Sequence, residues 1–231
     1  ELYRLQSWKN WYGTGSLLPI NRVMHAQRIF QIITSVLILS AAGVALPPGA
    51  SAYNIYYAEQ YYKLYHQNFY QYPEDFEENI WYLERALKRP FVNPLNAMAT
   101  IDNQKEWQRY RALFHLHVNL EMVKQYRLWA AEYDKRVAYF YNEPWKEQNL
   151  ESLEIAEHYY QTALYYWEQA LIWWARLEKM PYLHLEEIQY WEDECTRITN
   201  GDLDYQEIIY KDLQRLDKVR TQFESMDENT Y

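Results

Sequence analysis

The side chains that could do metal or acid–base chemistry are few, and their spacing limits what they can do. His115 and His117 lie two residues apart, which places them roughly 200° apart around a helix, so they cannot easily share a metal ion. His117 and Glu121 are four residues apart and could share one. Beyond residue 52 there is no Glu-x-x-His pair of the kind found in di-iron bundles. We therefore interpret these histidines as packed or surface residues, and we expect no metal and no other cofactor.

Nucleophilic side chains are also scarce beyond residue 52. The serines there are Ser152, which can cap a helix, and Ser225, which lies close to the end of the sequence. A serine nucleophile needs a positioned base and an orienting acid, which neither position suggests. Cys195 stands in WEDECTR, where three acidic neighbours should raise the pKa of the thiol and disfavour the thiolate. We expect this cysteine to be structural or merely tolerated.

Phosphate-binding loops and carboxylate pairs are the remaining catalytic options. Gly201 is the one glycine beyond residue 52, and phosphate-cradling loops need several glycines at fixed spacing. Pairs such as Glu77/Glu78 and Glu186/Glu187 would serve acid–base catalysis only if one carboxyl group were desolvated. A solvated helix face is the ordinary interpretation of such pairs. We therefore predict no catalytic residues and a protein that is not an enzyme.

The segment 24–52 has the order of a secretory signal peptide. His25 and Arg28 form a short basic start, an apolar run follows over 29–46, and Ala50-Ser51-Ala52 provides an A-x-A cleavage site. The alternative is an uncleaved membrane anchor, because eighteen mostly apolar residues nearly span a bilayer. We expect cleavage after Ala52 and interpret residues 1–23 as a gene-start misassignment.

The chain expected after cleavage, 53–231, is strongly acidic. It keeps 19 Lys and Arg against 31 Asp and Glu, which gives a net charge of −12 with histidine neutral. A nucleic acid would be repelled by this field, so we exclude it as a partner. With Cys195 alone, export does not serve disulfides within the chain.

Prolines and clusters of Asn, Asp and Gly divide 53–231 into about six amphipathic helices. The near absence of glycine and of β-branched runs argues against a sheet. Two of the helices, of about 39 and 32 residues, would measure roughly 58 and 48 Å at 1.5 Å per residue. We predict an all-α fold: an elongated helical bundle with a hairpin at 53–90 and long helices in 91–231. The expected helices cover 53–71, 73–90, 103–142 (capped by Asn103 and Glu106), 149–181 (capped by Asn149 or Ser152), 184–198 and 204–226 (capped by Asp204).

The fourth expected helix has a strict apolar stripe at alternating spacings of three and four residues. Alanine and aromatic residues alternate along it, so a neighbouring helix can approach closely while the rings fill the space beside it. A second stripe, Tyr159, Tyr166, Trp173 and Met180, makes this helix apolar over more than half of its circumference. We therefore expect it to be the central helix. The first stripe consists of Leu153, Ala156, Tyr160, Ala163, Trp167, Ala170, Trp174 and Leu177.

Tyrosine is the most conspicuous residue, with seven copies in the segment 56–72. A buried tyrosine can leave its hydroxyl at the rim of a narrow core, where it still forms hydrogen bonds. A second interpretation adds that surplus rings form adhesive faces, since Tyr and Trp are enriched at interface hot spots. Both can hold in one molecule. The predicted interaction residues are Tyr57, Tyr61, Trp81, Tyr159, Tyr166 and Trp173.

Residues 57–90 resemble one tetratricopeptide repeat, a helix–turn–helix unit of about 34 residues. The stretch DFEENIWYLERAL, which starts at Asp75, looks like the second helix of such a repeat, and Pro90 closes it. Asn79 stands where a small alanine is usual, and the glycine of the first helix is missing. The resemblance is therefore to a degenerate copy.

A wider resemblance covers most of 53–195. In an exported, acidic chain rich in Tyr and Trp, two segments look like the spirochaete periplasmic flagellar accessory proteins, which include collar and flagellar-coiling proteins: RPFVNPLNAMA and KRVAYFYNEPWKEQNLESLEIAEHYY. The resemblance implies a structural role in assembling or sheathing the periplasmic flagellum, with other periplasmic or flagellar proteins as partners. Membrane contact is expected only through an uncleaved signal, and a homo-oligomer is a further option.

Two rival functions come from other classes. A periplasmic cell-wall glycan- or peptide-binding helical protein would use exposed Trp side chains as stacking platforms, gathered in one concave cleft. A helical muramidase-like enzyme would use paired glutamates. A scaffold instead predicts long uninterrupted helices and exposed aromatic stripes.

The signal-peptide interpretation predicts that the native protein begins at Tyr53. N-terminal sequencing of the protein from its own cell checks this. An intact Met24 start recovered in the membrane fraction would show that the segment is an anchor.

Overall fold

The structure, a computed structural model, describes residues 54–138, 145–227 and 229–230. Within these residues it contains helices and no strand, so the predicted all-α fold is confirmed. The predicted signal peptide and the segment 1–23 lie outside the described residues. The helices are Ala58–Gln71 (α2), Phe76–Lys88 (α3), Gln104–Tyr133 (α4), Trp145–Leu177 (α5), Gln189–Thr199 (α6) and Tyr205–Ser225 (α7), with short 3-10 helices at Pro94–Asn96 (η1) and Glu186–Ile188 (η2).

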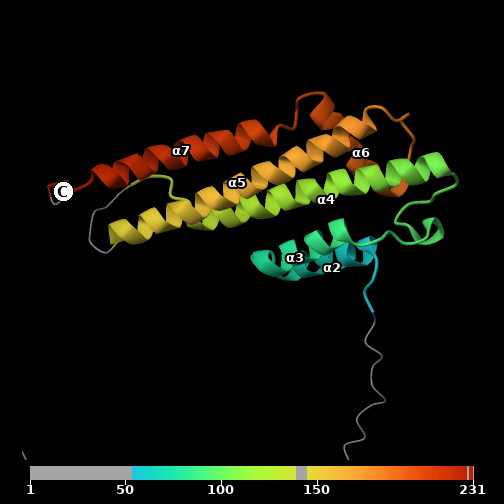
Figure 1. Cartoon of the computed structure of the whole chain (residues 1–231), viewed down its shortest axis with the longest axis horizontal. Coiled ribbons are helices and arrows are strands. Elements are labelled where there is room, and N and C mark those ends of the chain that lie inside the picture. Colours follow the sequence, from blue (N-terminus) through green and yellow to red (C-terminus); the bar gives the residue numbers. More distant parts are fainter. Residues whose placement is uncertain (1–53, 139–144, 228, 231) are drawn as a thin grey trace, which may run out of the picture. The chain divides into compact units, whose positions relative to one another are not determined.

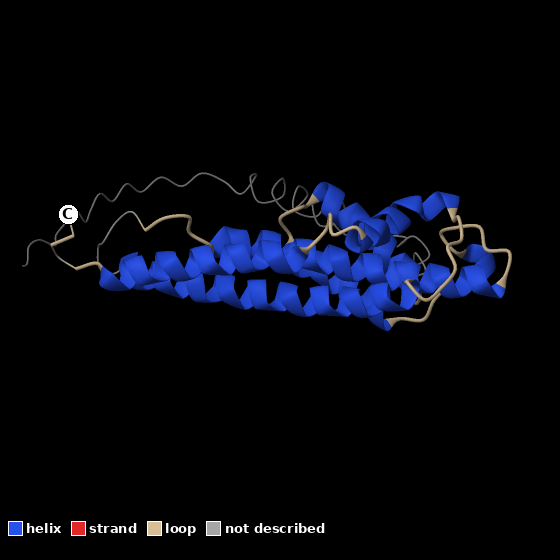
Figure 2. Ribbon diagram, turned by 90° about the horizontal axis from the view of Figure 1, so that it is seen from above, coloured by secondary structure: helices blue, strands red, loops and turns tan. Residues whose placement is uncertain are grey.

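The two longest helices, α4 and α5, lie side by side and run in opposite directions (Figures 1 and 2). Their 30 and 33 residues correspond to about 45 and 50 Å at 1.5 Å per residue. The chain returns a third time in α7, which packs along α5, while the hairpin of α2 and α3 packs on α4. None of the helices in the described ranges is long and apolar enough to cross a membrane.

The apolar stripe predicted for α5 is confirmed, because every member is buried except the half-buried Trp174. The expectation that α5 is the central helix needs a correction. The more deeply covered helix is α4, on which every side chain from Arg109 to Gln125 is buried except four half-buried ones: Arg111, His115, Glu121 and Lys124. The reason is that α4 is covered from several sides, by α3, α5 and α6.

The helix expected over 103–142 ends earlier, at Tyr133. The next residue, Asp134, leaves the helical conformation with φ −71° and ψ 146°. Its carboxylate pairs with Arg215 of α7 and accepts a hydrogen bond from the Tyr160 hydroxyl of α5 at 2.9 Å. These two contacts fix the Asp134 side chain between α5 and α7. The break lies in the ψ angle of Asp134, so it redirects the chain from Lys135 onward. The apolar pattern continues to Val137, which is exposed, and to Phe140, which lies outside the described residues.

The start of α5 also differs from expectation. It begins at Trp145 rather than at a cap formed by Asn149 or Ser152. Ser152 lies inside the helix, and its hydroxyl donates to the Tyr133 carbonyl at 2.7 Å. The serine therefore satisfies a carbonyl at the end of α4, where the last turn lacks partners of its own.

Three other helix ends follow the sequence signals. The side chain of Asn103 accepts hydrogen bonds from the backbone of Lys105 and Glu106 at the start of α4. Asp204 caps α7 by accepting from the backbone N–H of Glu207 at 3.1 Å. After α6, Gly201 has a φ of 77°, a left-handed conformation in which glycine carries no steric cost.

The helices α2 and α3 form a hairpin, closed by a 2.9 Å hydrogen bond from the Ala58 backbone N–H to the Pro90 carbonyl. Its unusual residue, Asn79, is fully buried. The Asn79 amide donates to the Tyr72 carbonyl and accepts from the Asn68 side chain, each at 3.2 Å. A polar residue is therefore tolerated where the repeat usually has alanine, because both ends of its amide have partners. Membership of the tetratricopeptide repeats stays a prediction.

Ala163 tests the close packing of α5. It is fully buried, so Ala163→Leu must displace a neighbouring helix and should destabilise the protein by about 1–3 kcal/mol. Glu168→Ala, on the exposed side of the same helix, should change stability by less than about 0.5 kcal/mol. Urea titration measures both, and equal effects would contradict the assigned packing face.

Candidate functional site

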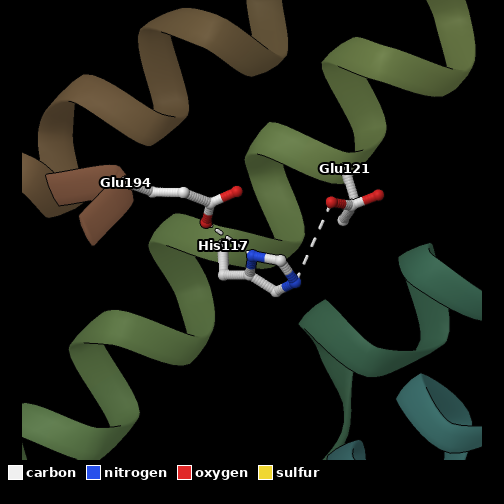
Figure 3. A group of neighbouring side chains, drawn as sticks. All are labelled: His117, Glu121 and Glu194. Carbon is white, nitrogen blue, oxygen red and sulfur yellow. Dashed lines mark hydrogen bonds and ion pairs between the residues drawn. The ribbon is translucent and has the colours of Figure 1, made fainter. Parts of the chain in front are cut away.

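A buried polar cluster joins three helices at His117 (Figure 3). The imidazole belongs to α4 and is almost completely buried. Its Nδ1 lies 2.6 Å from Glu194 Oε2 of α6, and its Nε2 lies 2.7 Å from the hydroxyl of Tyr62 of α2. Glu121, one turn along α4, reaches to 3.9 Å from Nε2. This one ring therefore ties both α2 and α6 to α4.

The hydroxyl of Tyr62 keeps its proton inside the bundle. Burial, assisted by the neighbouring Tyr190 hydroxyl, holds the pKa of Tyr62 far above its ordinary value, so the phenol stays protonated. The phenol and Nε2 of His117 lie within hydrogen-bond distance, and the tautomer of the ring decides which of the two donates. Nδ1 makes the other contact of the ring with the Glu194 carboxylate, so both ring nitrogens have a partner.

Carboxylate, imidazole and hydroxyl in this order also describe a nucleophilic triad. The side chain of Tyr62, however, is 0% exposed, and its hydroxyl also contacts the Tyr190 hydroxyl at 3.0 Å. A substrate cannot reach this oxygen in the described conformation, and a phenol held in its protonated form is a poor nucleophile. The chemistry that remains is a structural chain of hydrogen bonds.

The same residues could in principle hold a metal ion, since His117, Glu121 and Glu194 offer ligand atoms within 4.8 Å of one another. The ammonium group of Lys124 already lies between the carboxylates, 2.6 Å from Glu121 Oε1 and 3.2 Å from Glu194 Oε1. Although burial acts to raise it, His117 and Lys124 keep the pKa of the Glu121 carboxyl below its ordinary value. The cluster therefore supplies its own cation and fits an internal ion-pair network better than a metal centre.

A second buried contact links α4 and α6, nearer to the start of α4 than His117. The guanidinium of Arg109 forms two hydrogen bonds with the carboxylate of Glu192, the second at 2.6 Å, and both side chains are buried. Arg109 also donates to the carbonyl of Pro181 at 3.1 Å. Bidentate geometry of this kind is what a pair of buried charges needs to offset its desolvation.

The sequence points to Glu121 and to the acidic neighbours of Cys195, but not to the residues that contact them. Arg109 carried a usable signal, because it stands four residues before Leu113 and so extends the apolar stripe of α4. The sequence gives no such signal for Glu192 and Glu194, since acidic residues on a short helix are ordinarily solvated. Only the packing of α6 on α4 brings them into contact with Arg109 and His117.

A cavity of about 720 Å³ lies beside the His117 cluster and is lined by residues of α2, α4, α5 and α7, with Glu121 and Lys124 in its wall. Its volume is in the range of small-ligand sites. On the α7 side, the carboxylate of Asp212 accepts hydrogen bonds from Arg127 at 3.3 Å and from Arg215 at 2.8 Å. Three smaller cavities lie at Tyr70, at Phe76 and at η1. No tryptophan lines any of these four cavities, so the Trp-lined cleft expected of a glycan binder is not formed there.

Three of the predicted interaction residues lie along one edge of α5 and are half-buried. Each stacks on an aromatic ring of α4. The ring centroids are 4.1 Å apart for Tyr159 and Trp129, 5.6 Å for Tyr166 and Tyr126, and 4.2 Å for Trp173 and His115. These rings therefore contribute to packing inside the bundle, and a partner could touch only the parts that remain accessible.

The other three predicted interaction residues belong to the hairpin and its start. Trp81 is 45% exposed, and Tyr57 is also exposed. Tyr61 is only 6% exposed, and its ring packs edge-on against Trp81 at 5.8 Å. Tyr61 is therefore a core residue, because its position on α2 faces α3, and it offers almost no surface to a partner.

Cys195 behaves as the sequence indicated. Burial, with a contribution from the nearby Glu192 carboxylate, raises the pKa of its thiol to about 11. At neutral pH the group is a thiol and packs as a small apolar side chain.

The buried pair of Arg109 and Glu192 should be strongly coupled. Arg109→Met leaves Glu192 as an unpaired buried charge and should destabilise the protein by about 3–5 kcal/mol. The double variant Arg109→Met/Glu192→Leu should recover at least half of that loss, because no charge is then left alone. Urea unfolding of the two single variants and the double variant gives the coupling free energy.

A matched control is the exposed pair of Lys88 and Glu84, 2.7 Å apart on α3. Lys88→Met should cost less than about 1 kcal/mol. If Arg109→Met cost no more than Lys88→Met, the pair would not be a desolvated contact.

Comparison with known proteins identifies a family for α4 to α7. No curated protein and no solved structure matches the chain. Residues 105–226, more than half of the chain, match the family described as a domain of unknown function (DUF8513). This region contains His117, Glu194 and the pair of Arg109 and Glu192, whereas the hairpin of α2 and α3 precedes it. The chain belongs to this family, the domain of unknown function DUF8513.

Proposed function

We propose that the protein is a non-enzymatic helical assembly protein that binds other proteins through the outer edge of α5. The observation that carries the proposal is a row of large apolar side chains that face solvent beside the half-buried rings: Tyr165 is 54% exposed and Ile172 is 47% exposed. Exposed apolar surface next to aromatic anchors is typical of protein–protein contacts. The outer edge of α5 consists of Ile155, Tyr159, Tyr165, Tyr166, Ile172 and Trp173.

The spacing along α5 brings these residues together. Tyr159, Tyr166 and Trp173 recur every seven residues, and Tyr165 and Ile172 each precede one of them. The rings of Tyr165 and Tyr166 meet edge-on at 5.2 Å. The half-buried rings are held by stacking on α4, so they present a rigid surface that loses little side-chain entropy when a partner binds.

The arrangement of carboxylates and rings gives less support to the two rival functions, a muramidase-like enzyme and a glycan-binding protein. An acid catalyst needs a carboxyl group of raised pKa in a cleft. Of the paired glutamates, Glu187 accepts hydrogen bonds from Thr100, and these lower the pKa of its carboxyl group. Glycan stacking would favour a concave site lined by Trp, which the described cavities do not provide.

The cellular setting that we propose is the bacterial periplasm, and within it the spirochaete flagellar apparatus as a collar or filament-sheath component. Support comes from the signal-like segment 24–52, from the acidic and Tyr-rich composition, and from the two segments that resemble flagellar accessory proteins. The partners would be other periplasmic or flagellar proteins. Recovery of the native protein from the cytoplasmic fraction would overturn this setting.

The double variant Tyr165→Glu/Ile172→Glu tests the contact surface. Both residues are exposed, so folding should be retained, while charges at the outer edge of α5 should weaken partner binding by about 2 kcal/mol or more. The variant is tagged in the native cell, and the proteins that co-purify are compared with those of the wild type. We expect normal thermal stability and loss of the partners.

A matched control is Tyr210→Glu/Ile208→Glu, which makes the same two changes on the exposed face of α7. It should keep the partners. An unchanged set of partners with the α5 variant, or the same loss with both variants, would remove the outer edge of α5 from the function. Trp173→Ala is less decisive, because Trp173 also stacks on His115.

A further inference from the structure

Arg111 of α4 and Arg176 of α5 face each other across the contact between these two helices. His115 of α4 stacks on Trp173 of α5 with ring centroids 4.2 Å apart, so these two positions lie opposite each other. Arg111 lies one turn before His115, and Arg176 lies almost one turn after Trp173, in the last turn of α5. Because α4 and α5 run in opposite directions, these two turns are also opposite each other (Figure 1). We call the two residues the arginine pair.

The charges that act on His115 agree with this placement. Burial, together with the positive charges of Arg176 and Arg111, lowers the pKa of the His115 imidazole to about 4. Both guanidinium groups are therefore close enough to act on the same ring, and the ring itself is neutral at pH 7. The site has two positive charges with a neutral histidine beside them.

Neither member of the arginine pair has an acidic partner. Both guanidinium groups lie over indole rings, Arg176 at 4.2 Å from the ring centroid of Trp173 and Arg111 at 5.5 Å from that of Trp107. Within 54–138, 145–227 and 229–230, neither side chain forms an ion pair or a hydrogen bond. The face of an aromatic ring attracts a cation but does not neutralise its charge. Two like charges therefore face each other without a counter-charge.

The acidic residues closest in sequence to the arginine pair are engaged elsewhere. Glu178 accepts a hydrogen bond from the Thr199 hydroxyl of α6 at 2.8 Å. Glu106 accepts from the backbone of Asp102 at 2.7 Å and from the Asn103 side chain at 2.8 Å, at the start of α4. The chain has 32 Asp and Glu against 23 Lys and Arg, so carboxylates are in excess. That none of the described ones reaches these two cations leaves their charge to be met by an anion from outside.

The rings hold the two guanidinium groups in place. His115 and the guanidinium carbon of Arg176 each lie 4.2 Å from the ring centroid of Trp173, and two groups cannot occupy the same face of a ring at that distance. Arg176 is therefore fixed on the face of Trp173 that His115 leaves open, and it is exposed. Arg111 is half-buried with its Nε buried, so an anion would meet its terminal N–H groups. Such preorganised donors lose little freedom when an anion binds.

The number and direction of the donors favour one class of anion. A carboxylate has two oxygens in one plane and matches the fork of a single guanidinium group. A phosphoryl group has oxygens on several sides and can accept from two forks that approach from facing helices. At pH 7 a phosphate monoester carries a charge of about −1.5 to −2, close to the sum of the two arginine charges.

We propose that the arginine pair binds a phosphoryl group, as the free phosphate ion or as a phosphate ester, between α4 and α5. The oxygens of the group accept hydrogen bonds from Arg111 and Arg176 and offset the repulsion between them. The inference goes beyond the proposed protein contact and does not depend on it, because neither arginine belongs to the outer edge of α5.

The test is titration calorimetry of the purified protein with inorganic phosphate, in a chloride buffer of constant ionic strength at pH 7.5. We expect one phosphate to bind per chain. Arg111→Gln and Arg176→Gln should each weaken binding at least about tenfold, because one of the two forks is lost. Arg176→Lys keeps the charge but not the fork, so its affinity should lie between those of the wild type and Arg176→Gln. Arg176 is exposed, so its variants should fold, which circular dichroism checks.

A matched control is Arg85→Gln on α3, because the guanidinium of Arg85 also lies over an indole ring, 5.1 Å from the centroid of Trp81. It should bind phosphate like the wild type. Succinate, which carries two negative charges on separate carboxylates, should bind at least about tenfold more weakly than phosphate. No phosphate binding, equal losses in Arg85→Gln and Arg176→Gln, or succinate binding as tight as that of phosphate would overturn the proposal.

A second titration with glycerol 3-phosphate distinguishes the two sources of the phosphoryl group. Tighter binding of the ester than of inorganic phosphate would assign the site to a phosphorylated molecule. Binding of inorganic phosphate with exclusion of the ester would assign it to the free ion. Either result supports the arginine pair as the site only if Arg176→Gln weakens that binding as well.

Discussion

A charged or polar side chain that leaves water must find a partner inside the protein, and here the partners come from other helices. Arg109 finds Glu192, and His117 finds Glu194 and Tyr62. Apolar stripes alone allow helices to slide or rotate at small cost, whereas an unpaired buried charge costs several kcal/mol. These contacts therefore fix where α6 and the hairpin sit on α4, and the remaining packing adapts to that placement.

The abundance of tyrosine has a physical explanation in the same requirement. Several buried tyrosines place the ring in the core and the hydroxyl on a polar group of another helix. Tyr65 reaches Glu121 at 2.8 Å, and Tyr110 reaches Glu59 at 3.3 Å. Phenylalanine could fill the same volume but would remove one donor from each of these carboxylates. The rings that first suggested adhesion thus serve the interior as well, and only the exposed ones are available to a partner.

Much of the fold could be predicted from the sequence because its signals are local. The stripe of α5, the caps at Asn103 and Asp204, and the turn at Gly201 each depend on neighbours within a few residues. The end of α4 could not, because the apolar pattern continues past Tyr133 to Val137, and the contacts of Asp134 are with residues 26 and 81 positions away. The deeper covering of α4 was missed for a similar reason, since it depends on how three other segments return to one helix.

The candidate site was even less predictable. Glu194 lies 77 positions from His117, and nothing in its surroundings in the sequence distinguishes it from a solvated acid. The cavity depends on α2 and α7 both flanking α4, and no spacing within a single helix reports that. Of the predicted interaction residues, Tyr61 lies in the core, because a heptad pattern gives the apolar face of a helix but does not say which rings on it become buried.

The family match begins at residue 105, but residues before this position contribute contacts that complete the core of the matched region. Tyr62 and Tyr65, both on α2, supply the hydroxyl groups that contact His117 Nε2 and Glu121 Oε2. A chain cut at the family boundary would leave these two groups to water and open the face of α4 that the hairpin covers. We therefore expect the smallest autonomous folding unit to be larger than the matched region and to extend back through α2. A relative without this hairpin must carry a replacement for both hydroxyl groups, either elsewhere in its own sequence or on a bound protein.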